Sequence, residues 1–126
     1  MTPLPQAFLD RLAAQEELLV TSRDGPLQRS VRTWFAIEDG GTILLFAEAY
    51  SRKVTRWRAD PWVRLAIPGT RVQVEGVVRF LAPEDVDRVA PLVTRRWADW
   101  GATHGEGVRR MLRGGTHVLL RVEGSA

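Results

Sequence analysis

The sequence contains no cysteine and only two histidines, His104 and His117. The missing cysteines exclude disulfides and thiolate metal ligands, and two histidines are too few for a histidine-rich metal site. No apolar run approaches the roughly 18 residues of a membrane-spanning helix, and the first residues lack the charged-then-apolar order of a secretory signal. We therefore expect a cytoplasmic protein without a metal centre and without a membrane partner.

Lysine is almost absent as well, because Lys53 is the only one and all other basic side chains are arginines. The formal net charge is +3, although the sequence pI is about 10.5. Arginine stays protonated over this whole range, so a small excess of bases raises the pI strongly. Acidic and basic residues are interspersed along the chain and form no basic stripe, so we expect no nucleic-acid partner.

The length of 126 residues, with 44% hydrophobic and 26% charged residues, is typical of one soluble globular domain. We expect a single domain over residues 1–126. It would begin with a helical lead-in at 5–15 and carry a helical insertion at 83–113 before the last strand.

Six segments have the apolar or alternating pattern of β-strands. Glycine-containing turns separate several of them, for example at Asp24-Gly25-Pro26, Asp39-Gly40-Gly41 and Pro68-Gly69. Gly76 inside the fifth segment predicts a bulge or a bend. The predicted strands are residues 17–23, 29–38, 42–47, 62–67, 71–81 and 116–123. So dense a series of antiparallel strands closes into a barrel or a sandwich.

Four segments have helical spacing, namely residues 5–15, 52–59, 83–97 and 108–112. The second should end at Asp60, because a residue before proline disfavours helical geometry. In the third, Pro91 should kink or restart the helix.

The second helix begins with Ser51-Arg52-Lys53, which is unusual because a helix N-terminus already carries partial positive charge. Two cations behind a serine able to cap the helix are reasonable if an anion binds there. The simpler explanation is an exposed, solvated helix start, and this triplet alone does not exclude it.

Taken together, four blocks resemble the flavin-binding split β-barrel superfamily, which includes pyridoxamine 5′-phosphate oxidase and small relatives that use FMN or the deazaflavin F420. The blocks are residues 25–31, 44–47, 51–53 and 58–63. The resemblance covers about Leu18 to Trp97. It implies a mainly β protein, a six-stranded antiparallel split β-barrel with peripheral α-helices, and a homodimer with the cofactor at the subunit interface.

The resemblance also implies a cofactor site. In the oxidases, an arginine at the start of the second strand and an Arg-Lys pair after the third strand hold the FMN phosphate. By position, these residues correspond here to Arg29, Arg52 and Lys53. The cofactor-binding residues implied in this way are Arg29, Ser30, Val31, Arg32, Thr33, Trp34, Phe46, Ala47, Ser51, Arg52, Lys53 and Arg71. No catalytic residue is assigned.

Two departures from the oxidase pattern leave the identity of the cofactor open. The oxidases have a lysine where this chain has Trp34, and Trp34-Phe35 looks more like the actinobacterial flavin/deazaflavin oxidoreductases. The oxidases' C-terminal substrate residues have no counterpart. The resemblance therefore favours an FMN-dependent oxidoreductase that transfers hydride to or from a small unsaturated or aromatic substrate. The alternatives are an F420-dependent reductase and a non-catalytic flavin- or haem-binding carrier or sensor.

Several candidates also have a purely structural interpretation. Trp34 could pack at a dimer interface instead of stacking on a ligand, and surface arginines are often only solvated. The other tryptophans are expected to be core or interface anchors. His104 and His117 could act as acids or bases, although a single loop histidine is more often just exposed.

Overall fold

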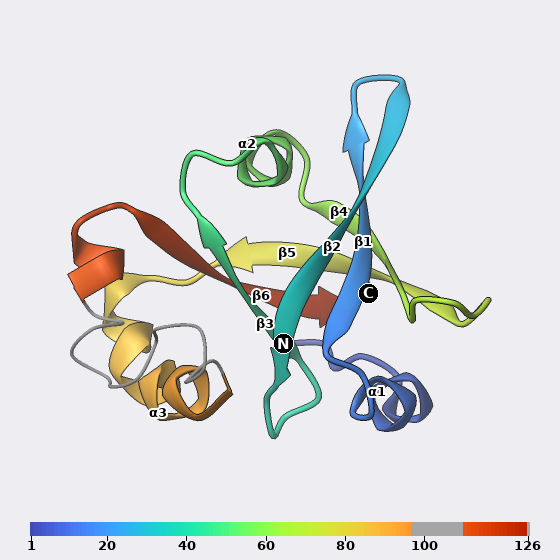
Figure 1. The fold of residues 1–126 in the computed structure, drawn as a ribbon, viewed down its shortest axis with the longest axis horizontal. Coiled ribbons are helices and arrows are strands. Elements are labelled where there is room, and N and C mark those ends of the chain that lie inside the picture. Colours follow the sequence, from blue (N-terminus) through green and yellow to red (C-terminus); the bar gives the residue numbers. More distant parts are fainter. Residues whose placement is uncertain (97–109, 126) are drawn as a thin grey trace.

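The computed structural model of this chain describes residues 1–96 and 110–125. It contains six antiparallel strands that close into a barrel in the order β1-β2-β3-β6-β5-β4 (Figure 1). The predicted mainly β, six-stranded barrel with peripheral helices is therefore confirmed. The strands are β1 (Glu17–Asp24), β2 (Leu27–Ile37), β3 (Ile43–Glu48), β4 (Trp62–Ala66), β5 (Gln73–Phe80) and β6 (His117–Gly124).

All six predicted strands are present, with ends displaced by one or two residues. The predicted turns lie between them, and Gly25, Gly41 and Gly69 have the positive φ that such turns require. Gly76 keeps an extended conformation opposite Gly124, and a Cβ there would lie 2.7 Å from the carbonyl oxygen of Glu123. Glycine is needed at this position because β5 and β6 approach closely.

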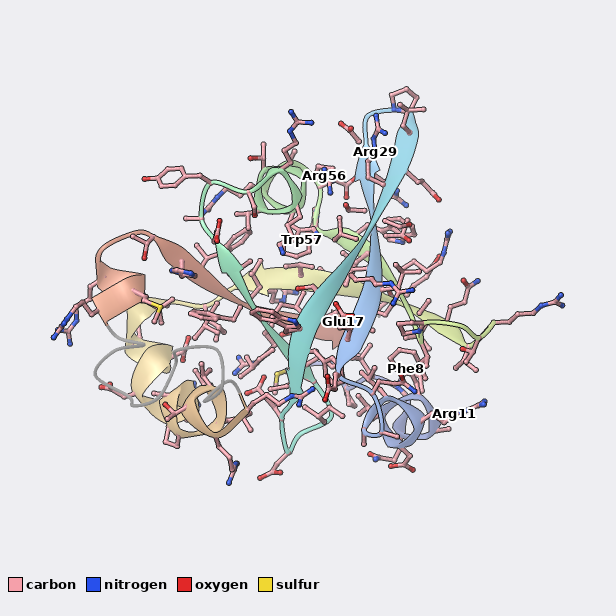
Figure 2. All side chains as sticks on the ribbon, viewed as in Figure 1. Phe8, Arg11, Glu17, Arg29, Arg56 and Trp57 are labelled. Carbon is pink, nitrogen blue, oxygen red and sulfur yellow. The ribbon has the colours of Figure 1, made fainter. Side chains whose placement is uncertain are left out.

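The barrel interior forms one apolar core that helices complete at both ends. Helix α1 (Gln6–Leu12) buries Phe8, Leu9 and Leu12 at one end, and α2 (Arg52–Ala59) buries Val54 and Trp57 at the other (Figures 1 and 2). Trp57 is only 1% exposed, as expected of a core anchor. Helix α2 ends at Asp60 in an extended conformation directly before proline, which confirms the predicted boundary.

A second apolar cluster lies on the outer face of β2, β3 and β6, where α3 (Val86–Arg96) covers the sheet. Val89 and Val93 of this helix pack against Ala36, Leu44 and Leu119. A short 3₁₀ turn, η1 (Pro83–Asp85), precedes α3. The helix continues through Pro91 to Arg96, so the predicted restart at this proline does not occur.

The remaining predictions for the insertion are covered only in part. Residues 110–113 are helical and end at the Gly114-Gly115 turn. The predicted break at residues 101–105, with His104, lies outside the described residues, as do Trp97 and Trp100. None of the described helices is long and apolar enough to cross a membrane.

Among the described residues, the strand pairing of the barrel opens between β2 and β3. β2 pairs with β3 only over Phe35–Ile37, opposite Ile43–Leu45, while Leu27–Trp34 of β2 pairs with β1 alone. Beyond Leu45, β3 pairs with β6 through Phe46–Glu48. The two strands therefore separate after this short ladder.

Candidate functional site

A pocket of about 450 Å³ lies where β2 and β3 separate. Its size falls within the range of small-molecule sites. The lining residues come from β1, β2, β3, the start of α2, and the segment that leads into β6: Glu17, Arg32, Thr33, Trp34, Phe46, Ala47, Glu48, Ser51, Lys53, Met111 and His117. Residues far apart in the sequence therefore meet in one cavity.

Seven of the twelve residues proposed from the sequence line this pocket. They are Arg32, Thr33, Trp34, Phe46, Ala47, Ser51 and Lys53. Trp34 and Phe46 are half-buried and offer aromatic surface for a planar ligand. Their alternation along β2 and β3 puts them on the outer face of the barrel, next to the edge that β2 and β3 leave open.

Five proposed residues do not line the pocket: Arg29, Ser30, Val31, Arg52 and Arg71. Arg29 lies near the tip of the β1–β2 hairpin, and its Nε is 3.3 Å from the Asp24 carboxylate (Figure 2). The Ser30 hydroxyl is 2.7 Å from the hydroxyl of Thr21. Arg52 and Arg71 are exposed. Within one chain, Arg29 and Lys53 therefore do not line a common pocket.

Ser51 occupies the N-cap position of α2, but its side chain does not cap the helix. The hydroxyl instead donates to the carbonyl of Glu48, at 2.8 Å. This corrects the predicted capping role: the bond closes the turn between β3 and α2 and thereby holds the helix start beside the pocket. The N-terminal N–H groups of α2 consequently receive no side-chain cap from Ser51.

Lys53 is the most informative charged group in the pocket. It is half-buried, and desolvation lowers the pKa of its ammonium below 10.5, while the nearby Glu48 carboxylate partly offsets this effect. A bound anion would compensate for the lost hydration of this cation. The position thus fits the phosphate-binding role that the sequence predicts for Lys53.

Sequence reasoning missed Glu17, Glu48 and Met111, and gave His117 no assigned role. Glu17 is the cross-strand partner of Trp34, and Glu48 is the partner of His117. Only the strand register brings these pairs together, and no local pattern in the sequence signals it. The formal charges of Glu17 and Glu48 balance those of Arg32 and Lys53, so one chain alone gives the pocket no excess positive charge.

Comparison with known proteins agrees with this architecture. The sequence profile of a family described as pyridoxamine 5′-phosphate oxidase matches residues 4–124. The chain therefore belongs to the pyridoxamine 5′-phosphate oxidase family, whose members share the split barrel. A search of curated protein sequences finds no match.

Solved structures show the same fold at low sequence identity. A putative pyridoxamine 5′-phosphate oxidase from Listeria innocua is 16% identical, with a TM-score of 0.69 and coverage of 96% of this chain and 93% of that one. An FAD-binding protein from Mesorhizobium loti is 16% identical, with a TM-score of 0.63 and coverage of 98% and 90%. A protein described as F420 reductase is 16% identical, with a TM-score of 0.64 and coverage of 98% and 97%.

Proposed function

We propose that this protein binds FMN in the pocket between β2 and β3 and works as an oxidoreductase, transferring hydride to or from a small unsaturated or aromatic substrate. The observation that carries the proposal is a desolvated cation, Lys53, in the same cavity as two aromatic side chains, Trp34 and Phe46. A cation stabilises a bound phosphate, and aromatic side chains pack against the ring system that carries it.

The residues present fit such a cofactor. Lys53 and the uncapped start of α2 would hold the phosphate, since helix N-terminal N–H groups and a cation both favour an anion. Trp34 and Phe46 would lie against the ring system. The bound cofactor would supply hydride chemistry, and the protein would bind, orient and polarise it.

We further propose that two copies of the chain complete the site, as the family resemblance implies. The charges that line the pocket within one chain cancel, whereas a phosphate dianion is best held by several converging cations. Arg29 and Arg71 are exposed and do not line the pocket of their own chain, so a second copy is the way in which they would reach a cofactor.

A deazaflavin such as F420 is the second candidate, and Trp34 favours it. This half-buried side chain lines the pocket at the position where the resemblance to the oxidases would put a lysine. With that charge missing, the preference for FMN over F420 rests on the remaining donors. A non-catalytic carrier or sensor on the same barrel is the third alternative.

Cofactor titration tests the proposal. The purified protein should bind FMN or F420 at micromolar concentration, followed by flavin fluorescence or visible absorption. Lys53→Ala and Arg52→Ala should each weaken binding by about 1–3 kcal/mol, the usual cost of losing a hydrogen bond to a charged group. Arg23→Ala is the control and should bind like the wild type, because Arg23 lies beside Asp60 and over the Trp62 ring and does not line the pocket.

The outcomes separate the alternatives. A colourless protein that binds neither cofactor would overturn both enzyme proposals. Binding of FMN without reduction by NAD(P)H, or of F420 without turnover, would favour the carrier. Unchanged affinity in both the Lys53 and Arg52 variants would show that the phosphate binds elsewhere.

A further inference from the structure

His117 begins β6 and lines the pocket, next to Phe46 on the neighbouring strand β3. The two rings are stacked, with centroids 5.0 Å apart and planes inclined by 18°. The imidazole is half-buried, and its cross-strand partner is Glu48. The stacking fixes the plane of the imidazole, and the contact of Nδ1 with Thr116 places the two ring nitrogens within it.

The Thr116 hydroxyl contacts one of these nitrogens. Its Oγ1 lies 3.1 Å from the carbonyl oxygen of Met111, to which it can donate, and 2.9 Å from Nδ1 of His117. A hydroxyl has a single proton, and the Met111 carbonyl can only accept. When the Thr116 hydroxyl donates to that carbonyl, its oxygen accepts from Nδ1–H. In a neutral imidazole this leaves Nε2 with a lone pair.

The backbone holds Thr116 in this position. Its N–H donates to the carbonyl of Met111 at 3.2 Å, and its carbonyl accepts from the N–H of Ala49 at 2.9 Å. Within residues 1–96 and 110–125, no protein hydrogen bond to Nε2 is formed. The charged groups that line the same pocket are Glu17 from β1, Arg32 from β2, Glu48 from β3 and Lys53 from α2.

We propose that His117 is a specificity-determining residue of the pocket. Through Nε2 it accepts a hydrogen bond from an N–H on the edge of a planar heteroaromatic ligand, and Thr116 is the positioning residue that keeps Nε2 unprotonated. The choice of a planar ring rests on the function proposed above, whereas the tautomer of His117 does not. FMN and deazaflavins both carry such an N–H at N3, so the contact would serve either cofactor.

The first experiment concerns the tautomer and needs no ligand. His104 is the only other histidine, so His104→Gln leaves one imidazole in the NMR spectrum. Long-range ¹⁵N–¹H correlations recorded near pH 9, well above the reference pKa of about 6.5 for histidine, should show the Nδ1–H form. Adding Thr116→Val should let the Nε2–H form appear. An Nε2–H tautomer in the protein with Thr116 intact would overturn the proposal.

The second experiment concerns the ligand contact and compares FMN with 3-methyl-FMN, which lacks the N3–H. His117→Asn keeps a donor near the position of Nδ1 but has no atom at Nε2. It should weaken FMN binding about tenfold, as for the loss of one hydrogen bond, and leave the already weaker binding of 3-methyl-FMN unchanged. His117→Gln, whose amide reaches the position of Nε2, should retain more of the FMN affinity.

Three outcomes would contradict the ligand contact. Equal FMN affinity in the wild type and His117→Asn would show that Nε2 does not bind the ring. Equal losses for FMN and 3-methyl-FMN would show a general structural effect of the substitution. If the wild type binds no FMN at all, the proposed function fails together with the ligand contact, and the spectrum of the free protein still decides the tautomer.

Discussion

The cations on two sides of the barrel are held in different ways. At the pocket, Lys53 is desolvated and has the Glu48 carboxylate as its partial compensation. On the outer face of β1 and β4, the guanidinium groups of Arg23 and Arg64 lie 4.3 and 5.2 Å from the centre of the Trp62 ring. Arg23 also lies 3.5 Å from the carboxylate of Asp60. One region leaves a cation short of partners, and the other covers an aromatic ring with cations that have partners.

This difference shows why positive charge alone does not locate a binding site in an arginine-rich chain. Arginines that stack on an aromatic ring and pair with a carboxylate have little to gain from a further anion. A half-buried lysine at a helix start, beside a gap in the sheet, has lost part of its hydration, and a bound anion compensates for that loss. Whether a cation already has interaction partners is therefore a better criterion for an anion-binding site than its charge alone.

The largest effect is expected at a third kind of cation, one that is largely buried and also paired. Arg121 of β6 donates from Nε and Nη2 to the Glu38 carboxylate at 2.7 and 2.9 Å, and the two side chains are only 15% and 17% exposed. Arg121→Met should lower the free energy of unfolding by about 3 kcal/mol, because it leaves a largely buried carboxylate without its cation. Chemical denaturation measures the change.

Arg29→Met is the matched control for that variant. Arg29 also pairs with a carboxylate, Asp24, at 3.3 Å, but the two side chains are 56% and 49% exposed. Its loss should cost less than about 1 kcal/mol. A similar cost for both variants would show that burial does not set the strength of these pairs.

The next effect tests the comparison directly through ligand affinity. Lys53→Met should weaken FMN binding by about 1–3 kcal/mol and Arg23→Met should leave it unchanged, because only the first cation lacks full compensation. Fluorescence titration of both variants gives the answer. Equal losses in the two variants would contradict the distinction between the two regions.

A smaller effect is expected from the aromatic ring under the arginines. Trp62→Leu removes the ring between Arg23 and Arg64 and should lower the free energy of unfolding by about 1 kcal/mol, as for a cation–π contact near the surface. Binding of FMN, normalised to the dimer fraction in solution, should not change. A loss of affinity per dimer would connect this face to the pocket.

The smallest effect is a pH dependence from Lys53. Its pKa is lowered in the folded chain relative to 10.5, so the unfolded chain binds more protons in the window between the lowered value and 10.5. The free energy of unfolding should therefore rise with pH through that window, since the cost of burying the charged ammonium disappears. Lys53→Met should lack this rise in denaturation curves recorded at increasing pH. Anion binding should weaken over the same window.

The fold could be predicted to a large extent because its signals are local. Alternation along residues 29–38, the glycine turns and the Asp60-Pro61 stop each act over a few residues, and the structure has strands, turns and a helix end at these places. The start of α2 was also visible as Arg52-Lys53. Its capping was predicted incorrectly, since the Ser51 hydroxyl has a competing acceptor, the Glu48 carbonyl, at the end of β3.

The site could be predicted only in part. Arg32, Trp34, Phe46 and Lys53 follow from the order of strands and from the family resemblance, and they do line one pocket. The combined use of Arg29, Arg52 and Lys53 for one phosphate stays a prediction, because Arg29 is paired with Asp24 at the hairpin tip.

The sequence by itself determined the order of strands and helices, the single lysine at a helix start and the aromatic residues nearby. Only the tertiary structure decided where β2 and β3 part, and that Glu17 lies opposite Trp34 and Glu48 opposite His117. The physical reason is that strand register depends on pairing across the whole barrel and shifts every side chain to the other face when it slips by one residue. The placement of the Thr116 hydroxyl between Met111 and His117 was also decided by the tertiary structure.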